Sequence, residues 1–335
     1  MGMKLFSLLV ISVVYRQLDV EGFLVFDSDD IFNPRTALRK LFETFTPAVI
    51  PLIANAFSYA PPVEKYPPGS ITPASFDAIK NNFVSAFMPF CPTQKIAGRE
   101  CICKMNYPFV KYIEDEDTGT QAIVAINRQF NQIVVSYRLT TNLQNWLDNF
   151  NMQLVDVAEM PRGVRVHRGI YSNFVASYLR VQDTVIELLD DPRYQNHTLF
   201  ITGYSLGGGM AQLSTSSWFK LLKTRNDTRP IEVISYANPR VGNAAFAQHM
   251  ESLNIPITRY TNGKDLVSHI PGRKLGFVHA GAEVYGTSSK IGYFLRNCSQ
   301  EFDEDPSCIL SAFGKRTSID HMYPFGKLFP LPPYC

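Results

Sequence analysis

The chain has 335 residues, of which 45% are hydrophobic and 19% are charged, with 32 lysines and arginines against 30 aspartates and glutamates. This composition supplies apolar side chains for a large core and excludes a chain that is disordered throughout. The formal net charge of +2 gives no basic surface of the kind that binds nucleic acid, so we expect no nucleic-acid partner.

The chain opens with a short apolar run at residues 5–15, flanked by Lys4 and Arg16. The run is shorter than the roughly 18 residues that a membrane-spanning helix needs, and it resembles the apolar region of a signal peptide. We therefore expect residues 1–22 to be a signal peptide, with Val20 and Gly22 beside the cleavage site, and no stable membrane span. The alternative is an uncleaved anchor or a buried strand.

The cysteines and the glycosylation sequons also indicate a protein of the secretory pathway. An even number of cysteines is typical of an oxidising compartment, and Asn-x-Ser/Thr sequons are acceptors in the secretory pathway. The sequence therefore predicts a secreted, extracellular glycoprotein with disulfide bonds. The six cysteines are Cys91, Cys101, Cys103, Cys298, Cys308 and Cys335, and the three sequons begin at Asn196, Asn226 and Asn297. The sequence contains no C-x-x-C pair and no H-E-x-x-H, so we expect no zinc or dithiol chemistry.

Five prolines between residues 60 and 73 forbid a regular helix or a central strand and indicate a linker. We expect residues 23–70 to be a propeptide-like N-terminal region that includes this linker, and residues 71–335 to form the main domain. There, β-rich runs at residues 122–126, 132–138, 198–202 and 231–236 alternate with longer stretches, and residues 205–223 are long enough for a helix. This rhythm predicts an α/β fold.

The strongest motif is the G-x-S-x-G at residues 203–207, which follows the apolar run 199–202 and precedes an apolar segment at 210–213. In this context Ser205 lies on a tight turn from strand to helix, and we expect the turn to expose its hydroxyl. The motif predicts that Ser205 is a nucleophile. The alternative is the start of a glycine-rich helix.

A serine hydroxyl needs a histidine to accept its proton and an acid to orient that histidine. In this fold the chain order is serine, acid, histidine. Asp265 lies 60 residues beyond Ser205, where the run 257–260 ends and a loop begins, which is a suitable place for the acid. Asp320 is a rival, but it adjoins His321, and adjacent side chains point apart.

The choice of histidine stays open at this point. His249 precedes the acid, and we expect it on a helix surface. His269 follows Asp265 by four residues and is expected to make local hydrogen bonds. Spacing does not decide between the two that remain, His279 and His321.

Several stretches give the chain a family resemblance from about residue 71 to residue 335. The region resembles the class 3 triacylglycerol lipases secreted by filamentous fungi, particularly mucoral moulds. The matching stretches are residues 166–170, 202–208, 238–243, 265–271, 276–281 and 318–321.

This resemblance implies an α/β-hydrolase fold, with a mostly parallel sheet flanked by helices and a short helical lid. It also implies that Ser205 is the nucleophile, Asp265 the acid and His321 the base. The expected reaction is hydrolysis of acylglycerol esters through an acyl-enzyme, without metal or cofactor.

An oxyanion hole needs hydrogen-bond donors, and the N–H of Leu206 after the nucleophile is one of them. Residues 134–140 resemble the family's strand followed by Arg-Gly-Ser/Thr, which implies Thr140 as the second donor. Leu139 replaces the family's glycine, a departure that bears on the geometry of the loop. The alternative for Thr140 is a threonine that merely ends a strand.

A helical stripe follows directly. Apolar residues recur at the spacing of one helix face and comprise Leu143, Trp146, Leu147 and Phe150. The pattern itself fits either a helix packed permanently on the core or a mobile cover. The resemblance implies a lid that turns its apolar face toward lipid.

The residue before the nucleophile and the spacing of the cysteines both differ from the family's pattern. Tyr204 replaces a histidine that usually precedes the nucleophile, and we expect it to flank the pocket without a part in proton transfer. The resemblance implies three disulfides: Cys91 with Cys335, Cys101 with Cys103, and Cys298 with Cys308. Only one residue separates Cys101 from Cys103, where the family has two, so that bridge is expected to be strained.

Three functions are compatible with these residues. The first is a secreted, monomeric triacylglycerol lipase that acts on lipid or ester substrates at a lipid–water interface. The second keeps the triad but acts on other esters, as a phospholipase A1, a mono- or diacylglycerol lipase or a feruloyl-type esterase. The third is a binding module that has lost turnover, which the complete triad disfavours and Leu139 alone favours.

Overall fold

The computed structural model describes residues 82–83, 85–86, 109–115, 120–138, 152–289, 292–300, 304–312, 320–321 and 324. All of them belong to the second of two compact units, Val63–Cys335. The expected signal peptide and propeptide-like region lie outside the described residues. So do the expected lid residues, Thr140, Leu139 and four of the six cysteines.

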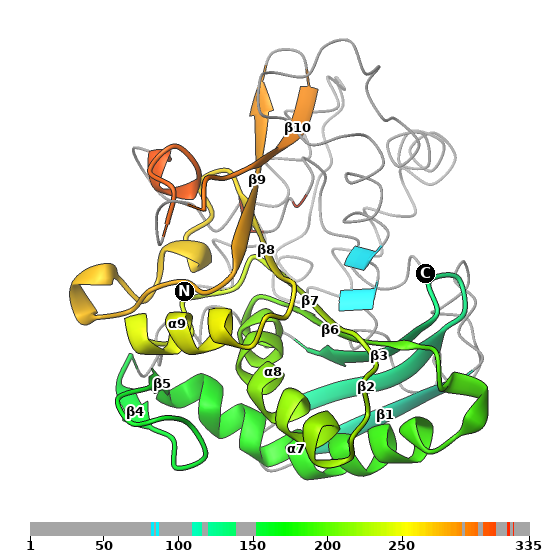
Figure 1. Ribbon diagram of the computed structural model, residues 1–335. Coiled ribbons are helices and arrows are strands. Elements are labelled where there is room, and N and C mark those ends of the chain that lie inside the picture. The colour runs from blue at the N-terminus through cyan, green and yellow to red at the C-terminus, as the bar shows by residue number, and fades with distance from the viewer. Residues whose placement is uncertain are drawn as a thin grey trace, which may run out of the picture. The chain divides into compact units, whose positions relative to one another are not determined.

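Eight strands form one sheet in the order β1-β2-β3-β6-β7-β8-β9-β10 (Figure 1). The run β3-β6-β7-β8-β9 is parallel, and the strands at both ends pair antiparallel. The strands are β1 (Phe109–Asp115), β2 (Thr120–Asn127), β3 (Gln132–Tyr137), β6 (Thr198–Tyr204), β7 (Ile231–Tyr236), β8 (Ile257–Asn262), β9 (Ala282–Ser289) and β10 (Gly292–Asn297). A separate antiparallel pair consists of β4 (Leu154–Asp156) and β5 (Arg165–His167).

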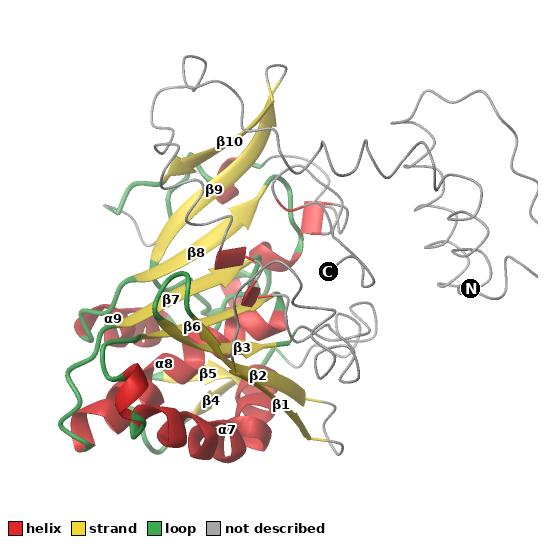
Figure 2. Ribbon diagram, turned by 90° about the vertical axis from the view of Figure 1, so that its right-hand side faces the viewer, coloured by secondary structure: helices red, strands yellow, loops and turns green. Residues whose placement is uncertain are grey.

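Three α-helices are described: α7 (Arg168–Leu189), α8 (Leu206–Thr224) and α9 (Ala244–Ser252). Helices α7 and α8 pack against each other, α7 on β1 and β2 and α8 on β6 and β7 (Figures 1 and 2). Four short 3₁₀ turns are η3 (Pro192–Tyr194), η4 (Val267–His269), η5 (Arg273–Leu275) and η6 (Ile309–Ser311). The predicted α/β architecture with a mostly parallel sheet is confirmed, and so are all four predicted strands and the helix after Ser205.

The sheet is buried on both faces, as strand β2 illustrates. Its alternate residues Ala122, Val124 and Ile126 join the core cluster beneath the helices, whereas Ile123 and Ala125 join the cluster on the opposite face. Burying each large aliphatic side chain contributes about 1.5–3 kcal/mol. Strands buried on both faces are therefore expected to have nearly continuous apolar sequences.

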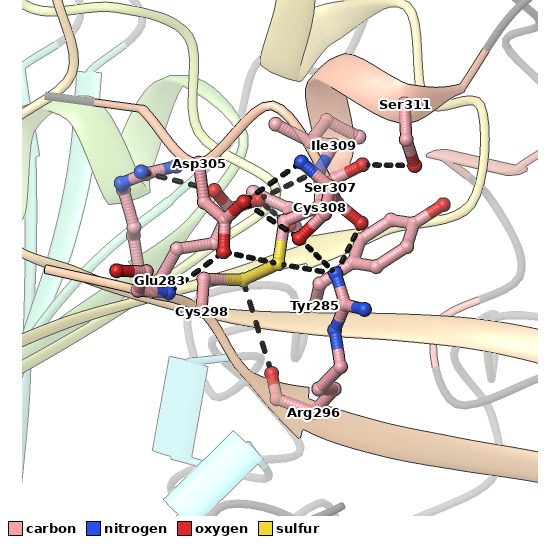
Figure 3. The surroundings of a disulfide bond; sticks show 12 residues. Glu283, Tyr285, Arg296, Cys298, Asp305, Ser307, Cys308, Ile309 and Ser311 are labelled. Carbon is pink, nitrogen blue, oxygen red and sulfur yellow. Dashed lines mark hydrogen bonds and ion pairs between the residues drawn. A yellow bond between two sulfur atoms is a disulfide. The ribbon is translucent and has the colours of Figure 1, made fainter. Parts of the chain in front are cut away.

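The predicted bridge between Cys298 and Cys308 is present (Figure 3). It closes the segment between β10 and η6, where the Asp305 carboxylate accepts hydrogen bonds from the backbone N–H groups of Ser299 and Ser307, each at 2.7 Å. The other two expected disulfides involve cysteines outside the described residues. Within the part of the chain that the structure describes, no helix has the length and apolar content to cross a bilayer.

Candidate active site

Ser205 occupies the turn between β6 and α8. Its backbone has φ 56° and ψ −123°, a combination that L-residues adopt only when their surroundings enforce it. The flanking glycines make the turn possible. A Cβ on Gly207 would lie 2.0 Å from the carbonyl oxygen of Tyr137, and one on Gly203 would lie 2.3 Å from the carbonyl carbon of Gly207. The motif therefore lets α8 start directly against two neighbouring strands.

The side chain of Ser205 is buried, with no exposed surface. The prediction of an exposed hydroxyl was therefore wrong. A G-x-S-x-G turn fixes the direction in which the hydroxyl points from the sheet, but not which other segments pack over it. The structure has this position closed to water.

Asp265 follows β8, as predicted, and its carboxylate contacts the imidazole of His321. Oδ2 accepts from Nδ1 of His321 at 2.9 Å, and the two side chains are 0% and 1% exposed. The same carboxylate accepts from the N–H of Val267 at 2.8 Å and from the hydroxyl of Ser268 at 3.2 Å. The carboxylate is thus held in one orientation beside the imidazole.

The Asp265 contact determines which nitrogen of His321 can accept a proton. Because a carboxylate accepts, Nδ1 carries the hydrogen and the lone pair is on Nε2. Nε2 and the hydroxyl of Ser205 are both buried, and neither makes a hydrogen bond within the described residues. Nε2 of His321 is therefore available as an acceptor, and no hydrogen bond joins it to the hydroxyl of Ser205. Such bonds are often long before substrate binds.

Tyr204 has a role that the sequence did not reveal. Its hydroxyl donates a hydrogen bond to the main-chain oxygen of His321, and the two rings lie 5.1 Å apart between centroids. Burial raises the pKa of Tyr204 well above its ordinary value of 10, and the neighbouring charge of Asp265 adds to this, so the phenol keeps its proton. Tyr204 thus fixes the backbone that carries the imidazole, although it stands outside the proton path.

Asp320 and His279, the alternative acid and histidine left open by the sequence, make other contacts in the structure. Asp320 does not act on His321: its carboxylate accepts from the N–H of Lys264 at 2.6 Å. His279 is buried and lies next to the main chain, with Nε2 2.9 Å from the carbonyl oxygen of Ser268. Neither residue takes the place of Asp265 or His321.

The other two histidines lie where they were expected. His269 makes the predicted local contact, with Nδ1 2.6 Å from the carbonyl oxygen of Asp265, and its Nε2 lies 3.1 Å from that of Ile309. His249 lies half-buried on α9, where its Nε2 pairs with the hydroxyl of Ser216 at 2.9 Å.

A buried ion pair supports the loop that follows Asp265. Arg240 donates to both carboxylate oxygens of Glu304, at 2.7 and 2.6 Å, and to the carbonyl oxygens of His269 and Pro271, at 2.5 and 3.0 Å. Burial raises the pKa of Glu304, but the hydrogen bonds from Arg240, together with charge interactions with His279, Arg240 and Arg259, outweigh it and lower the pKa to about 2. The sequence analysis missed this pair, although residues 238–243 were among the family-like stretches.

Leu206 is the first residue of α8 and is 5% exposed. Its N–H is one of the helix-start donors that have no acceptor within the helix. Among the described residues, one cluster has the residue types of a metal site, namely Glu283, Cys298 and Cys308. Both sulfurs are committed to the disulfide, so they are not thiolate ligands.

A buried serine on the turn from β6 to α8, an Asp–His pair whose aspartate follows β8, and a mostly parallel sheet are the features of an α/β-hydrolase fold. The stretch 134–275 matches the family model described as Lipase (class 3). Over these residues, which include Ser205 and Asp265, the chain is similar to class 3 lipases.

Two relatives illustrate the similarity. A lipase of Rhizomucor miehei is 29% identical over 62% of this chain and 55% of its own length. The secreted mono- and diacylglycerol lipase 1 of Fusarium solani is 30% identical over 50% of this chain and 48% of its own length. The chain thus spans about half the length of these curated relatives.

Solved structures agree in fold. The triacylglyceride lipase of Rhizomucor miehei has a TM-score of 0.68 at 22% identity, covering 78% of this chain and 98% of that one. The complex of Rhizomucor miehei lipase with its propeptide has a TM-score of 0.69 at 21% identity, covering 81% of this chain and 91% of that one.

Proposed function

We propose that the protein is a carboxylic ester hydrolase in which Ser205 is the nucleophile, His321 the base and Asp265 the orienting acid. The observation that carries this proposal is the buried 2.9 Å contact between Asp265 and His321. His321 also accepts a hydrogen bond from Tyr204, the residue directly before Ser205, and the backbone of Ser205 is held at φ 56°. A buried carboxylate that fixes the imidazole tautomer is what a serine hydrolase requires.

The proposed reaction has two halves. Nε2 of His321 takes the hydroxyl proton as the oxygen of Ser205 attacks the ester carbonyl carbon, and Asp265 stabilises the imidazolium. His321 then protonates the leaving alcohol, and an acyl-enzyme remains. A water molecule, deprotonated by the same nitrogen, releases the acid and restores Ser205.

The negative oxygen of each tetrahedral intermediate needs donors in place before it forms. We propose the N–H of Leu206 as one donor and Thr140 as the other. Because Ser205 has no exposed surface, substrate entry requires a cover to move. The apolar stripe of residues 143–150 is the proposed lid.

We further propose triacylglycerols at a lipid–water interface as substrates, and a secreted monomer whose residues 1–22 are a signal peptide and 23–70 a propeptide. Names of relatives support this assignment: a fungal lipase, and a solved complex of a lipase with its propeptide. Partial glycerides are the second candidate, because the Fusarium solani relative is named a mono- and diacylglycerol lipase. A relative named phospholipase A1 adds phospholipids.

The test measures initial rates on a short-chain triacylglycerol taken through its solubility limit and on a long-chain triacylglycerol emulsion. Ser205→Ala is the blank, and Ser252→Ala, at the exposed end of α9, is the matched control. We expect Ser205→Ala to fold and to lack activity, while Ser252→Ala retains it.

A rate that jumps at the solubility limit, together with activity on the emulsion, supports a lipase with a lid. Smooth saturation and little action on the emulsion would instead make the protein an esterase for soluble substrates. Activity retained by a clean preparation of Ser205→Ala would overturn the assignment of the nucleophile.

A further inference from the structure

Two of the three sequons lie on surface loops that the proposed catalysis does not use. Asn196 is in the short loop between η3 and β6, and Asn226 is in the loop that follows α8; both side chains are exposed. Asn-x-Ser/Thr is the acceptor sequence for N-glycosylation, which requires a surface position in the folded product.

These two loops form one continuous surface. The N–H of Leu199 donates to the carbonyl oxygen of Pro230 at 2.9 Å. The guanidinium of Arg229 donates to the carbonyl oxygen of Tyr194 at 3.3 Å. The hydrogen bonds thus join the segment around Asn196 to the segment around Asn226.

This surface lies at the opposite end of β6 and α8 from Ser205. Strand β6 has 7 residues and separates Asn196 from Ser205 by about 20 Å at about 3.3 Å per residue. Helix α8 has 19 residues and runs back over about 28 Å at 1.5 Å per residue, ending just before Asn226. Both acceptor side chains are therefore at the amino edge of the parallel strands, whereas Ser205 is at the carboxyl edge.

We propose that Asn196 and Asn226 carry N-linked oligosaccharides that keep the amino edge of the sheet in water and leave the carboxyl edge free to meet lipid. A bond forms between Nδ2 of the asparagine and the anomeric carbon of a lipid-linked oligosaccharide. The bond from that carbon to the donor's pyrophosphate breaks, and the amide proton leaves with the departing lipid pyrophosphate. The modification rests on the proposed secretion and does not depend on ester hydrolysis.

The third sequon is not part of this surface. Asn297 ends β10 next to Cys298, which is buried and bonded to Cys308 (Figure 3). The proposal therefore concerns Asn196 and Asn226 only.

The experiment expresses the full chain behind a host signal peptide in a eukaryotic secretory host, so that entry into the pathway does not depend on residues 1–22. Peptide N-glycosidase in ¹⁸O-water converts each glycosylated asparagine to labelled aspartate, which peptide mass spectrometry reads one position at a time. Thr198→Val and Thr228→Ala remove the two sequons singly. Thr198→Ser and Thr228→Ser retain them and are the matched controls.

Changing the threonines avoids new backbone strain. Asn226 has φ 54°, a conformation that asparagine tolerates better than glutamine does. Valine keeps the β-branched shape at Thr198, the first residue of β6, and Thr228 is exposed.

We expect label at both asparagines in the wild type and in the serine controls, and loss of label only at the matching asparagine in each sequon variant. The enzymatically deglycosylated protein should turn over a soluble ester at the unchanged rate, since the glycans are remote from Ser205. Unlabelled Asn196 and Asn226 in the secreted wild type would overturn the proposal. Ser205→Ala should be labelled like the wild type. Loss of label would therefore count against the glycosylation proposal alone, whereas ester hydrolysis retained by Ser205→Ala would count against the hydrolase assignment alone.

Discussion

Replacing Glu304 by glutamine tests whether the buried ion pair with Arg240 stabilises the fold around the Asp265 loop. The two side chains are 0% and 2% exposed, so the substitution leaves a guanidinium buried without its counter-charge. Removing one partner of such a pair destabilises proteins by about 3–5 kcal/mol.

The pKa of Glu304 gives a second estimate of how much its carboxylate stabilises the folded protein. That pKa is about 2 in the folded protein, against an ordinary value of 4.5. Each unit of difference corresponds to about 1.4 kcal/mol, so the carboxylate contributes about 3 kcal/mol of stability. Since the folded pKa is the lower one, this contribution is complete above about pH 4.5 and is lost as the pH falls toward 2.

The assay is thermal or urea unfolding, followed by circular dichroism from pH 7 to pH 2. We expect Glu304→Gln to unfold about 6–12 °C below the wild type at pH 7, with the difference shrinking between pH 4.5 and pH 2. Glu251→Gln, an exposed carboxylate on α9, is the matched control and should change stability by less than about 0.5 kcal/mol. A difference for Glu304→Gln below about 1 kcal/mol at pH 7, or one that stays constant with pH, would refute the reasoning.

Two further substitutions test the turn at Ser205 and the support of His321, the proposed base. Gly207→Ala places a methyl group 2.0 Å from the carbonyl oxygen of Tyr137, so we expect no folded product. The control Gly272→Ala meets no heavy atom within 4 Å and should be recovered normally. Equal yields of the two variants in one expression trial would contradict this expectation. Tyr204→Phe removes the donor to the main chain of His321 but keeps the ring, and we expect kcat to fall about 2- to 10-fold, the worth of one hydrogen bond, with KM unchanged. Steady-state kinetics on a soluble ester measure this, and an unaltered kcat would show that the phenol has no positioning role.

Local features of the chain were predictable because their causes are local. The run Leu199–Thr202 and the helix after Ser205 follow from apolar patterning and from glycines that no other residue can replace. Asp265 was located because a strand ends just before it. In each case the physical reason lies within a few residues of the feature.

What could not be predicted depends on contacts between distant segments. Order along the chain does not reveal which of His279 and His321 meets Asp265; that depends on how the segment around residue 320 returns to the sheet. The burial of Ser205 depends likewise on what packs over the turn. Arg240 and Glu304 are 64 residues apart, and no periodicity links them.

The wide sequence separation of the site has a consequence for the order of events in folding. The contact of Asp265 with His321 closes a loop of 56 residues, and that of Tyr204 with His321 spans 117. The second closure costs about 2 kcal/mol more chain entropy than a ten-residue loop does. The turn at Ser205, by contrast, is made by α8 and the neighbouring strands β3, β6 and β7. During refolding, we therefore expect the sheet and its helices to regain their spectroscopic signal first, and the Asp265–His321 pair to assemble last.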